Sequence, residues 1–247
     1  MNSIELDILF PAFIAGLLVL ATHIPFGMRV LQRGVIFADL AIAQIAGLGV
    51  IVAGLLDLTD RPLLVQAVAV ASALCGAGLL AWIEQRAAEV KEACIGLTFV
   101  LAASLGILLM SRDVHAGEHL KDLLVGQILW VSNTQLIATA VLTTALLAVW
   151  KLLRQRLGNF GFYALFAIAI TASVQLVGIY LVFASLIVPA LASYRIRQRR
   201  YLFAFAVGIA GYALGLLFSV WFDLPAGAAI VWAMLLSGGL LLLKRRR

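Results

Sequence analysis

Charged residues and cysteines are both scarce in this sequence. Only 12% of its 247 residues are charged, against about 25% in a typical soluble domain. Hydrophobic residues make up 64% of the chain, and the mean hydropathy is +1.10. The two cysteines, Cys75 and Cys94, lie within apolar segments, which indicates small hydrophobic side chains and neither a disulfide nor a metal pair. This balance predicts a polytopic membrane protein.

Motifs for nucleotide binding and covalent catalysis are absent as well. No GxxxxGK[ST] occurs, so the chain does not bind nucleotide through a P-loop, and an ATPase that energises it would be a separate subunit. Ser, His and Asp are present, but no strand–turn–helix context supports a nucleophile. We therefore predict no catalytic residue, no bound cofactor and no enzyme activity. The Lys and Arg residues are dispersed through short loops, which gives a topology signal and no nucleic-acid-binding patch.

Long apolar segments follow one another along the whole chain. A transmembrane helix needs about 20 mainly apolar residues, and this criterion predicts an all-α helical bundle of about 8–9 membrane-spanning segments in a single transmembrane domain over residues 1–247. The acidic start MNSIELD is unlike a signal peptide, so the first apolar segment is expected to be a true span. Gly178 and Pro189 are expected to interrupt the helices between 160 and 194. Gly211 and Gly215 have the small-residue spacing that lets two helices approach closely. The predicted spans are at about 8–28, 35–56, 62–83, 93–111, 134–153, 160–176, 178–194, 201–222 and 225–243.

The positive charges predict the orientation of these spans. If the N-terminus is outside, the inside segments are RVLQR, EQRAAEVK, KLLRQR, RIRQRR and KRRR. Together they hold 15 of the 18 Lys and Arg residues. Cytoplasmic loops carry an excess of these residues, so we predict a bundle with the N-terminus outside and the C-terminus inside.

The segment Val35–Leu56 is apolar enough to cross a bilayer, yet it carries Asp39 and Gln44. An ionisable side chain inside a membrane helix costs about 2.5–3.5 kcal/mol on insertion scales and needs a partner or a wet cavity. In a helical hairpin that turns near residues 32–33, His23 comes level with a position between Asp39 and Gln44. Positions five apart on a helix point about 140° away from each other. Asp39 and Gln44 therefore do not face one narrow site in an undistorted helix.

Three interpretations of this polar group stay open. His23, Asp39 and Gln44 could line a path for a cation, because imidazole with carboxylate suits borderline divalent metals such as zinc or manganese. Alternatively, His23 and Asp39 could neutralise each other structurally. Asp39 is also only a few residues beyond Arg33, so it could lie in the headgroup layer.

A second candidate metal site lies in the polar stretch SRDVHAGEHLKD. His115 and His119 are four residues apart and share a face if the stretch is helical, with Glu118 beside them. Two imidazoles with a carboxylate could collect zinc, and the alternative is a solvated polar loop. The HxxEH pattern resembles an inverzincin arrangement, but a short loop offers neither the buried helix nor the third ligand of a protease. The apolar segment Leu123–Asn133 that follows predicts either a short interfacial helix carrying Trp130 or an early start of the fifth span.

Five stretches recur in a fixed order along the chain: PFGMRVLQRGVIFADLAIAQIAGLG, EACIGLTFVLAASLGILL, DLLVGQILWVS, VGIYLVFASLIVPALAS and FDLPAGAAIV. In these the chain resembles the permease subunits of bacterial zinc/manganese ABC importers, the metal-type ABC permease family. The resemblance implies a multi-pass permease domain in the bacterial inner membrane that acts as a homodimeric pore. It also implies two cytoplasmic ATPase subunits and a periplasmic metal-binding protein that delivers Zn(II), Mn(II) or a similar ion, which the chain carries only transiently.

The chain departs from the family pattern at two places. Members usually carry GDxLxHAxxxG on the second span, and matching on Gly49 puts Gln44 at the His position and Leu40 at the Asp position, so that Asp39 is displaced by one residue. The connection KLLRQRLGNFG is also shorter than the family's cytoplasmic segment, in which a short helix docks on the ATPase. Our interpretation is a divergent importer permease for a divalent Zn/Mn/Fe-class metal. The alternatives are a membrane scaffold that keeps the fold without passing metal, and an ATP-independent ion carrier.

Overall fold

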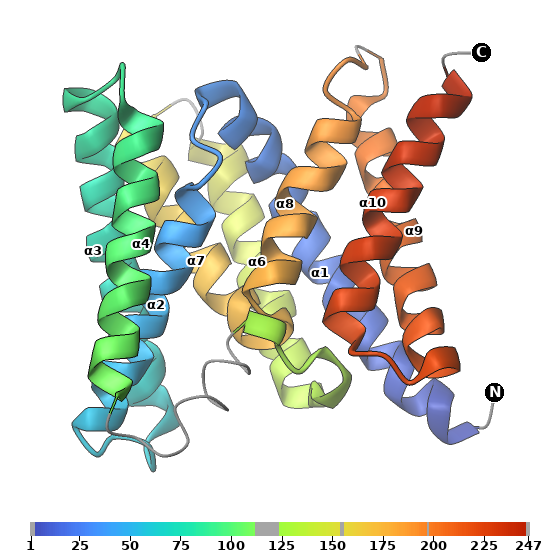
Figure 1. The fold of residues 1–247 in the computed structure, drawn as a ribbon, viewed down its shortest axis with the longest axis horizontal. Coiled ribbons are helices and arrows are strands. Elements are labelled where there is room, and N and C mark those ends of the chain that lie inside the picture. The colour runs from blue at the N-terminus through green and yellow to red at the C-terminus, as the bar shows by residue number, and fades with distance from the viewer. Residues whose placement is uncertain (1–2, 112–123, 154–155, 197, 246–247) are drawn as a thin grey trace. The chain divides into compact units, whose positions relative to one another are not determined.

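The structure is a computed structural model that describes residues 3–111, 124–153, 156–196 and 198–245. Within these ranges the regular structure is helical, without a strand (Figure 1). The chain divides into two compact units, Met1–Arg33 with Leu124–Leu147 and Ser173–Arg247, and Gly34–Leu123 with Ala148–Ala172. In chain order the helices are α1 (Ser3–Arg33), α2 (Ala38–Leu55), α3 (Pro62–Arg86), α4 (Lys91–Met110), the 3-10 helix η1 (Ile128–Trp130), α6 (Asn133–Leu153), α7 (Asn159–Val177), α8 (Ile179–Ala192), α9 (Arg200–Phe222) and α10 (Ala226–Arg245).

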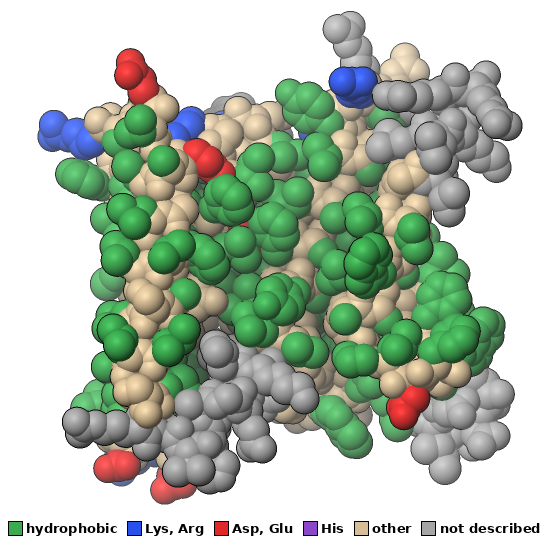
Figure 2. Space-filling model, in the orientation of Figure 1, with side chains coloured by type: hydrophobic (Ala, Val, Ile, Leu, Met, Phe, Trp, Pro, Cys, Tyr) green, Lys and Arg blue, Asp and Glu red, His purple; other side chains and the backbone are tan. Residues whose placement is uncertain are grey.

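Most of these helices have the length and composition of membrane spans. In the part of the chain that the structure describes, α1, α2, α3, α4, α6, α7 and α9 are long and apolar enough to cross a membrane, and α8 and the first part of α10 are shorter apolar helices. The prediction of an all-α bundle is confirmed, and the predicted segments correspond one to one with helices. Figure 2 shows hydrophobic side chains over most of one face, with Lys and Arg near the ends of helices. The orientation with the N-terminus outside stays a prediction.

In the first unit, α1, α8, α9 and α10 pack against one another through small residues. A Cβ added to Gly211 would lie 2.6 Å from the Cα atom of Met234, and one added to Gly215 would collide with the Cα atom of Ile230. Both partners belong to α10, so the Gly211–Gly215 pair brings α9 and α10 into close contact within the chain. On the other side of α9, the buried Tyr212 hydroxyl shares a hydrogen bond of 2.9 Å with the Ser185 hydroxyl of α8.

The backbone between α7 and α8 crosses another non-helical segment of the first unit. Gly178 separates the two helices with φ +79°, and Gly126 has φ +70°. A Cβ on either glycine would collide with the backbone at the other. Glycine is required here because the region of positive φ and the close approach both exclude a side chain. The predicted interruption at Gly178 is confirmed.

The predicted interruption at Pro189 is wrong. α8 continues through Pro189 and ends at Ala192. A proline so close to the C-terminal end removes one backbone hydrogen bond but leaves no long stretch of helix to displace. The turn that follows is formed by a hydrogen bond from the Ser193 N–H to the Pro189 carbonyl, at 3.1 Å.

The segment before α6 contains a short helix that is separate from α6. Its short 3-10 helix η1 buries Ile128 and leaves Trp130 exposed. The start of α6 is then capped by Ser132, whose hydroxyl accepts the Gln135 N–H at 3.2 Å while the Gln135 side chain accepts the Ser132 N–H at 2.9 Å. This reciprocal pair is a capping box, which defines a helix start. The early start of the fifth span is therefore wrong, and a short separate helix is present, although its depth in a bilayer stays a prediction.

In the second unit, α2 packs against both α3 and α4. Small residues again allow the approach: a Cβ on Gly49 would lie 2.9 Å from the Cα atom of Ala69, and one on Gly76 would lie 2.8 Å from the Ile45 side chain. α4 exposes a row of apolar side chains that includes Leu97, Leu101 and Leu108. α2 therefore lies against both α3 and α4, and it carries Asp39 in its first turn.

Candidate functional site

Asp39 is a buried acid at the start of α2. The chain turns at Gly34, which has φ +65°, and α2 begins at Ala38, one residue before Asp39. The side chain is 1% exposed, and neither carboxylate oxygen has a hydrogen-bond partner among the described residues. A buried ionised group without a partner is strongly unfavourable. The first turn of a helix favours a negative charge, which offsets only part of this cost, so Asp39 is the strongest candidate for a functional residue in this unit.

A second carboxylate, Glu92, approaches the same helix start. Glu92 lies in the first turn of α4, and its Oε1 atom accepts the Phe37 N–H at 3.0 Å. Its Oε2 atom is buried without a hydrogen-bond partner in the described ranges. Phe37 is two residues before Asp39, so this hydrogen bond holds Glu92 at the helix start that carries Asp39. Sequence reasoning missed Glu92 because this residue falls between the inside segment EQRAAEVK and the predicted span at 93–111; the acidic residue in EACIG was the available signal.

Gln44 does not join these acids. It lies five residues beyond Asp39 on a continuous helix, so the two side chains point about 140° apart, as the sequence predicts. Gln44 is partly exposed, whereas Asp39 is buried. No geometry in this unit therefore brings the Gln44 amide to the carboxylates, and its role as a metal ligand stays a prediction.

His23 is buried in α1, in the first unit. Its Nδ1 atom lies 2.9 Å from the Val19 carbonyl oxygen and 3.0 Å from the Thr22 hydroxyl. Because the carbonyl can only accept, the neutral ring carries its proton on Nδ1 and presents a lone pair on Nε2. Nε2 is buried and has no hydrogen-bond partner in the described part of the chain. This is the tautomer of an imidazole held to bind a metal through Nε2. A contact between His23 and Asp39 stays a prediction, because the two residues belong to different units.

The predicted loop site lies outside the described residues. His115, Glu118 and His119 all fall within 112–123. Their interpretation as a zinc-collecting loop stays a prediction. Elsewhere, no group of three or more His, Cys, Asp or Glu side chains is gathered in the ranges that the structure describes.

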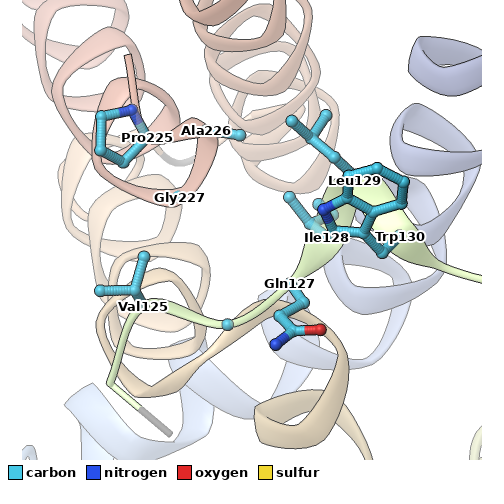
Figure 3. A pocket seen from close by; sticks show the side chains of 9 residues that line it. Val125, Gln127, Ile128, Leu129, Trp130, Pro225, Ala226 and Gly227 are labelled. Carbon is cyan, nitrogen blue, oxygen red and sulfur yellow. The ribbon is translucent and has the colours of Figure 1, made fainter. Parts of the chain in front are cut away.

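A cavity of about 430 Å³ lies in the first unit (Figure 3). It is lined by the segment Val125–Trp130 and by the turn Pro225–Gly227 at the start of α10. Figure 3 shows the Trp130 and Leu129 side chains on one side of this space and Pro225 on the other. A Cβ on Gly227 would lie 2.7 Å from the Val125 carbonyl oxygen, so glycine is needed where the two segments meet. Trp130 is 78% exposed beside the cavity.

Comparison with known proteins places this architecture in a family. The profile of the ABC 3 transport family matches residues 5–160 and 153–242, which is most of the chain. The chain belongs to the ABC 3 transport family. The family resemblance read from the five ordered stretches is thereby confirmed. As a member of this family the chain is a multi-pass membrane protein, in agreement with its helices.

Two curated relatives of this chain are named as transport proteins. The chain is 26% identical over 163 residues to a probable iron transport system membrane protein of Haemophilus influenzae, covering 57% of this chain and 60% of that one. It is 29% identical over 174 residues to the manganese transport system membrane protein MntC of Halalkalibacterium halodurans, covering 62% and 60%. The matched region thus spans 60% of the length of each relative.

A solved structure shares the fold of this ABC 3 family member. The structure of PsaBC from Streptococcus pneumoniae in complex with Fab superposes with a TM-score of 0.70, and the alignment covers 96% of this chain and 88% of that chain. At 23% sequence identity this likeness establishes the fold alone. The likeness agrees with the helical bundle predicted from the apolar segments.

Proposed function

We propose that this chain is the inner-membrane permease subunit of an ABC importer that moves a divalent transition metal into the cell. The observation that carries the proposal is Asp39: a buried carboxylate without a hydrogen-bond partner, on a membrane helix of an ABC 3 family member. Such a residue is expensive to keep in a membrane and marks a path for ions or protons. The relatives named for iron and manganese transport favour a transition metal as the cargo.

Each of the two units offers a donor suited to such a metal. Asp39 offers two free carboxylate oxygens, and His23 offers the lone pair of Nε2. Carboxylate with imidazole suits manganese, iron and zinc. A site with only one or two protein ligands, in which water completes the coordination shell, binds the ion weakly. Weak binding suits an ion that only passes through the protein. Which metal is carried is left to the uptake experiment below.

The partners follow from the proposed role. The chain has no P-loop, so ATP would be hydrolysed by separate cytoplasmic ATPase subunits. In the predicted orientation, Val125–Trp130 and Pro225–Gly227 are both outside, and together they line a cavity beside the exposed Trp130. We place the docking of the periplasmic metal-binding protein there. Two copies of the chain would form the pore in the lipid bilayer.

A scaffold that keeps the fold without passing metal is the second candidate. The short connection favours it, because α6 ends at Leu153 and α7 begins at Asn159, which leaves little chain for a helix that docks on an ATPase. An ATP-independent carrier would also fit this short connection. These candidates differ from the importer in whether metal moves and in whether movement depends on an ATPase.

Metal accumulation in cells separates the three candidates. Cells with and without the subunit are loaded with zinc, manganese or iron, and the cell-associated metal is measured in the presence and absence of a candidate partner ATPase. The importer predicts accumulation that needs both proteins. Accumulation without the ATPase would support the carrier, and no change for any of the three metals would overturn transport and leave the scaffold.

A further inference from the structure

Two acids near the start of α2 have three buried carboxylate oxygens without hydrogen-bond partners among the described residues. Two belong to Asp39 and the third is Oε2 of Glu92. The remaining oxygen, Oε1 of Glu92, accepts the N–H of Phe37, two residues before Asp39. Glu92 is therefore held against the turn that immediately precedes Asp39. All three residues lie in the same compact unit.

Each acid by itself has a structural explanation, but the pair does not. The first turn of a helix stabilises one nearby negative charge, and Glu92 supplies a hydrogen bond to a backbone N–H at the start of α2. Two carboxylates at one buried place cannot both stay ionised without a positive charge between them. Asp39 is 1% exposed and unpartnered, so water does not provide that compensation freely. The arrangement calls for a cation or for a shared proton.

We infer that Asp39 and Glu92 together bind a divalent transition cation at the start of α2, with Glu92 as a ligand that the sequence did not indicate. The donor set is all oxygen, which suits manganese and iron(II) better than a thiolate-seeking ion. The hydrogen bond to Phe37 fixes the Glu92 carboxylate and leaves Oε2 as a ligand, which is how a backbone or side-chain partner commonly orients a metal-binding group.

The predicted orientation gives this site a place in transport. The turn at Gly34 and the residues before Lys91 both fall in segments assigned to the inside by their positive charges. The cation bound by Asp39 and Glu92 would then be at the cytoplasmic end of α2, close to where the transported ion leaves the protein. The inference deepens the proposed function and rests on it for this step only; cation binding itself is tested without transport.

The test is Mn²⁺ binding by the purified full-length chain in lipid nanodiscs, followed by the loss of the free-ion electron paramagnetic resonance signal. His115→Ala and His119→Ala are introduced into every sample, so that the predicted loop site does not contribute. Glu92→Gln keeps an oxygen that can accept the Phe37 N–H but removes the charge. Asp39→Asn does the same at the other ligand. Glu89→Gln is the matched control, since Glu89 is exposed in the turn before α4.

We expect the parent chain to bind Mn²⁺. Asp39→Asn and Glu92→Gln should each lower the affinity for Mn²⁺ by about tenfold or more. Glu89→Gln should bind as the parent does. If Glu92→Gln also binds as the parent does, Glu92 is only a helix cap and the inference is overturned, while Asp39 keeps its place in the proposed function. If the parent binds no Mn²⁺, the acids share a proton and the inference is overturned as well.

A labelling measurement on the unsubstituted chain keeps the inference testable should a variant fail to fold. A hydrophobic carbodiimide modifies buried carboxyl groups, and the modified positions are read by mass spectrometry. Mn²⁺ should protect Asp39 and Glu92 together, and protection of Asp39 alone would overturn the shared site. Normal metal accumulation in cells that lack the subunit would refute the proposed function, whatever the outcome of the binding and labelling measurements.

Discussion

Gly178→Ala tests whether the α7–α8 interruption is built into the fold. The backbone there has φ +79° and ψ 162°, a region that only glycine occupies readily, and a side chain forced into it costs about 1–3 kcal/mol. The added Cβ would also collide with the Gly126 N atom and lie 2.8 Å from the Leu124 carbonyl oxygen. Overpacking of this kind costs about 1–3 kcal/mol more. The two contributions together predict a destabilisation of about 2–6 kcal/mol.

Gly96→Ala is the matched control for this prediction. Gly96 lies inside α4, and a Cβ added to it would meet nothing within 4 Å. Alanine in a helix interior is favoured over glycine by about 0.8–1.0 kcal/mol, so this variant should be equally or more stable. Both are measured by reversible denaturation in mixed micelles, with the fraction of folded protein followed by circular dichroism. Equal stability of the two variants would refute the crossing of Gly178 and Gly126.

Two further predictions concern side-chain hydrogen bonds. Tyr212→Phe and Ser185→Ala should each destabilise the first unit by about 0.5–1.5 kcal/mol. The double variant should be destabilised by less than the sum of the two, because interhelical hydrogen bonds in membranes couple by about 0.6 kcal/mol on average. An additive double-mutant cycle would mean that the hydroxyls do not interact. Ser132→Ala should cost about 1 kcal/mol by removing the α6 capping box, and Ser104→Ala, at an exposed position within α4, serves as its control; equal effects of the two would argue against a cap.

Helix positions were predictable because the signal is local. A run of apolar residues long enough to cross a bilayer is visible in the sequence without knowledge of its neighbours, and the predicted span at 62–83 became α3 at Pro62–Arg86. Gly178 was predictable for the same reason, since a glycine between two short apolar runs marks a break. Pro189 was misjudged because the effect of a proline depends on how much helix follows it, and only three residues do.

The candidate site was only half predictable. Asp39 stands out in the sequence because it is the charge inside an apolar run, and the structure places it buried and unpartnered. Glu92 is 53 residues away and looks like an ordinary loop acid, and only the packing of α4 against α2 brings it to the Phe37 N–H. The orientation of the His23 ring was equally hidden, since it depends on the Val19 carbonyl of the same helix. The placement of such side chains depends on their contacts in the folded chain, and a single sequence does not display these contacts.

The most direct test of metal import is uptake by cells that carry Asp39→Asn in place of the unmodified subunit. Asp57→Asn is the control, because Asp57 is an exposed acid just beyond the other end of α2, with a φ of 56° that asparagine adopts as readily as aspartate. Both variants are brought to equal membrane abundance, and accumulation of manganese, iron and zinc is measured with the ATPase present. Asp39→Asn is expected to lower uptake to the level of cells without the subunit, while Asp57→Asn leaves uptake unchanged. Uptake by Asp39→Asn at the unmodified rate would contradict metal import along a path that includes Asp39.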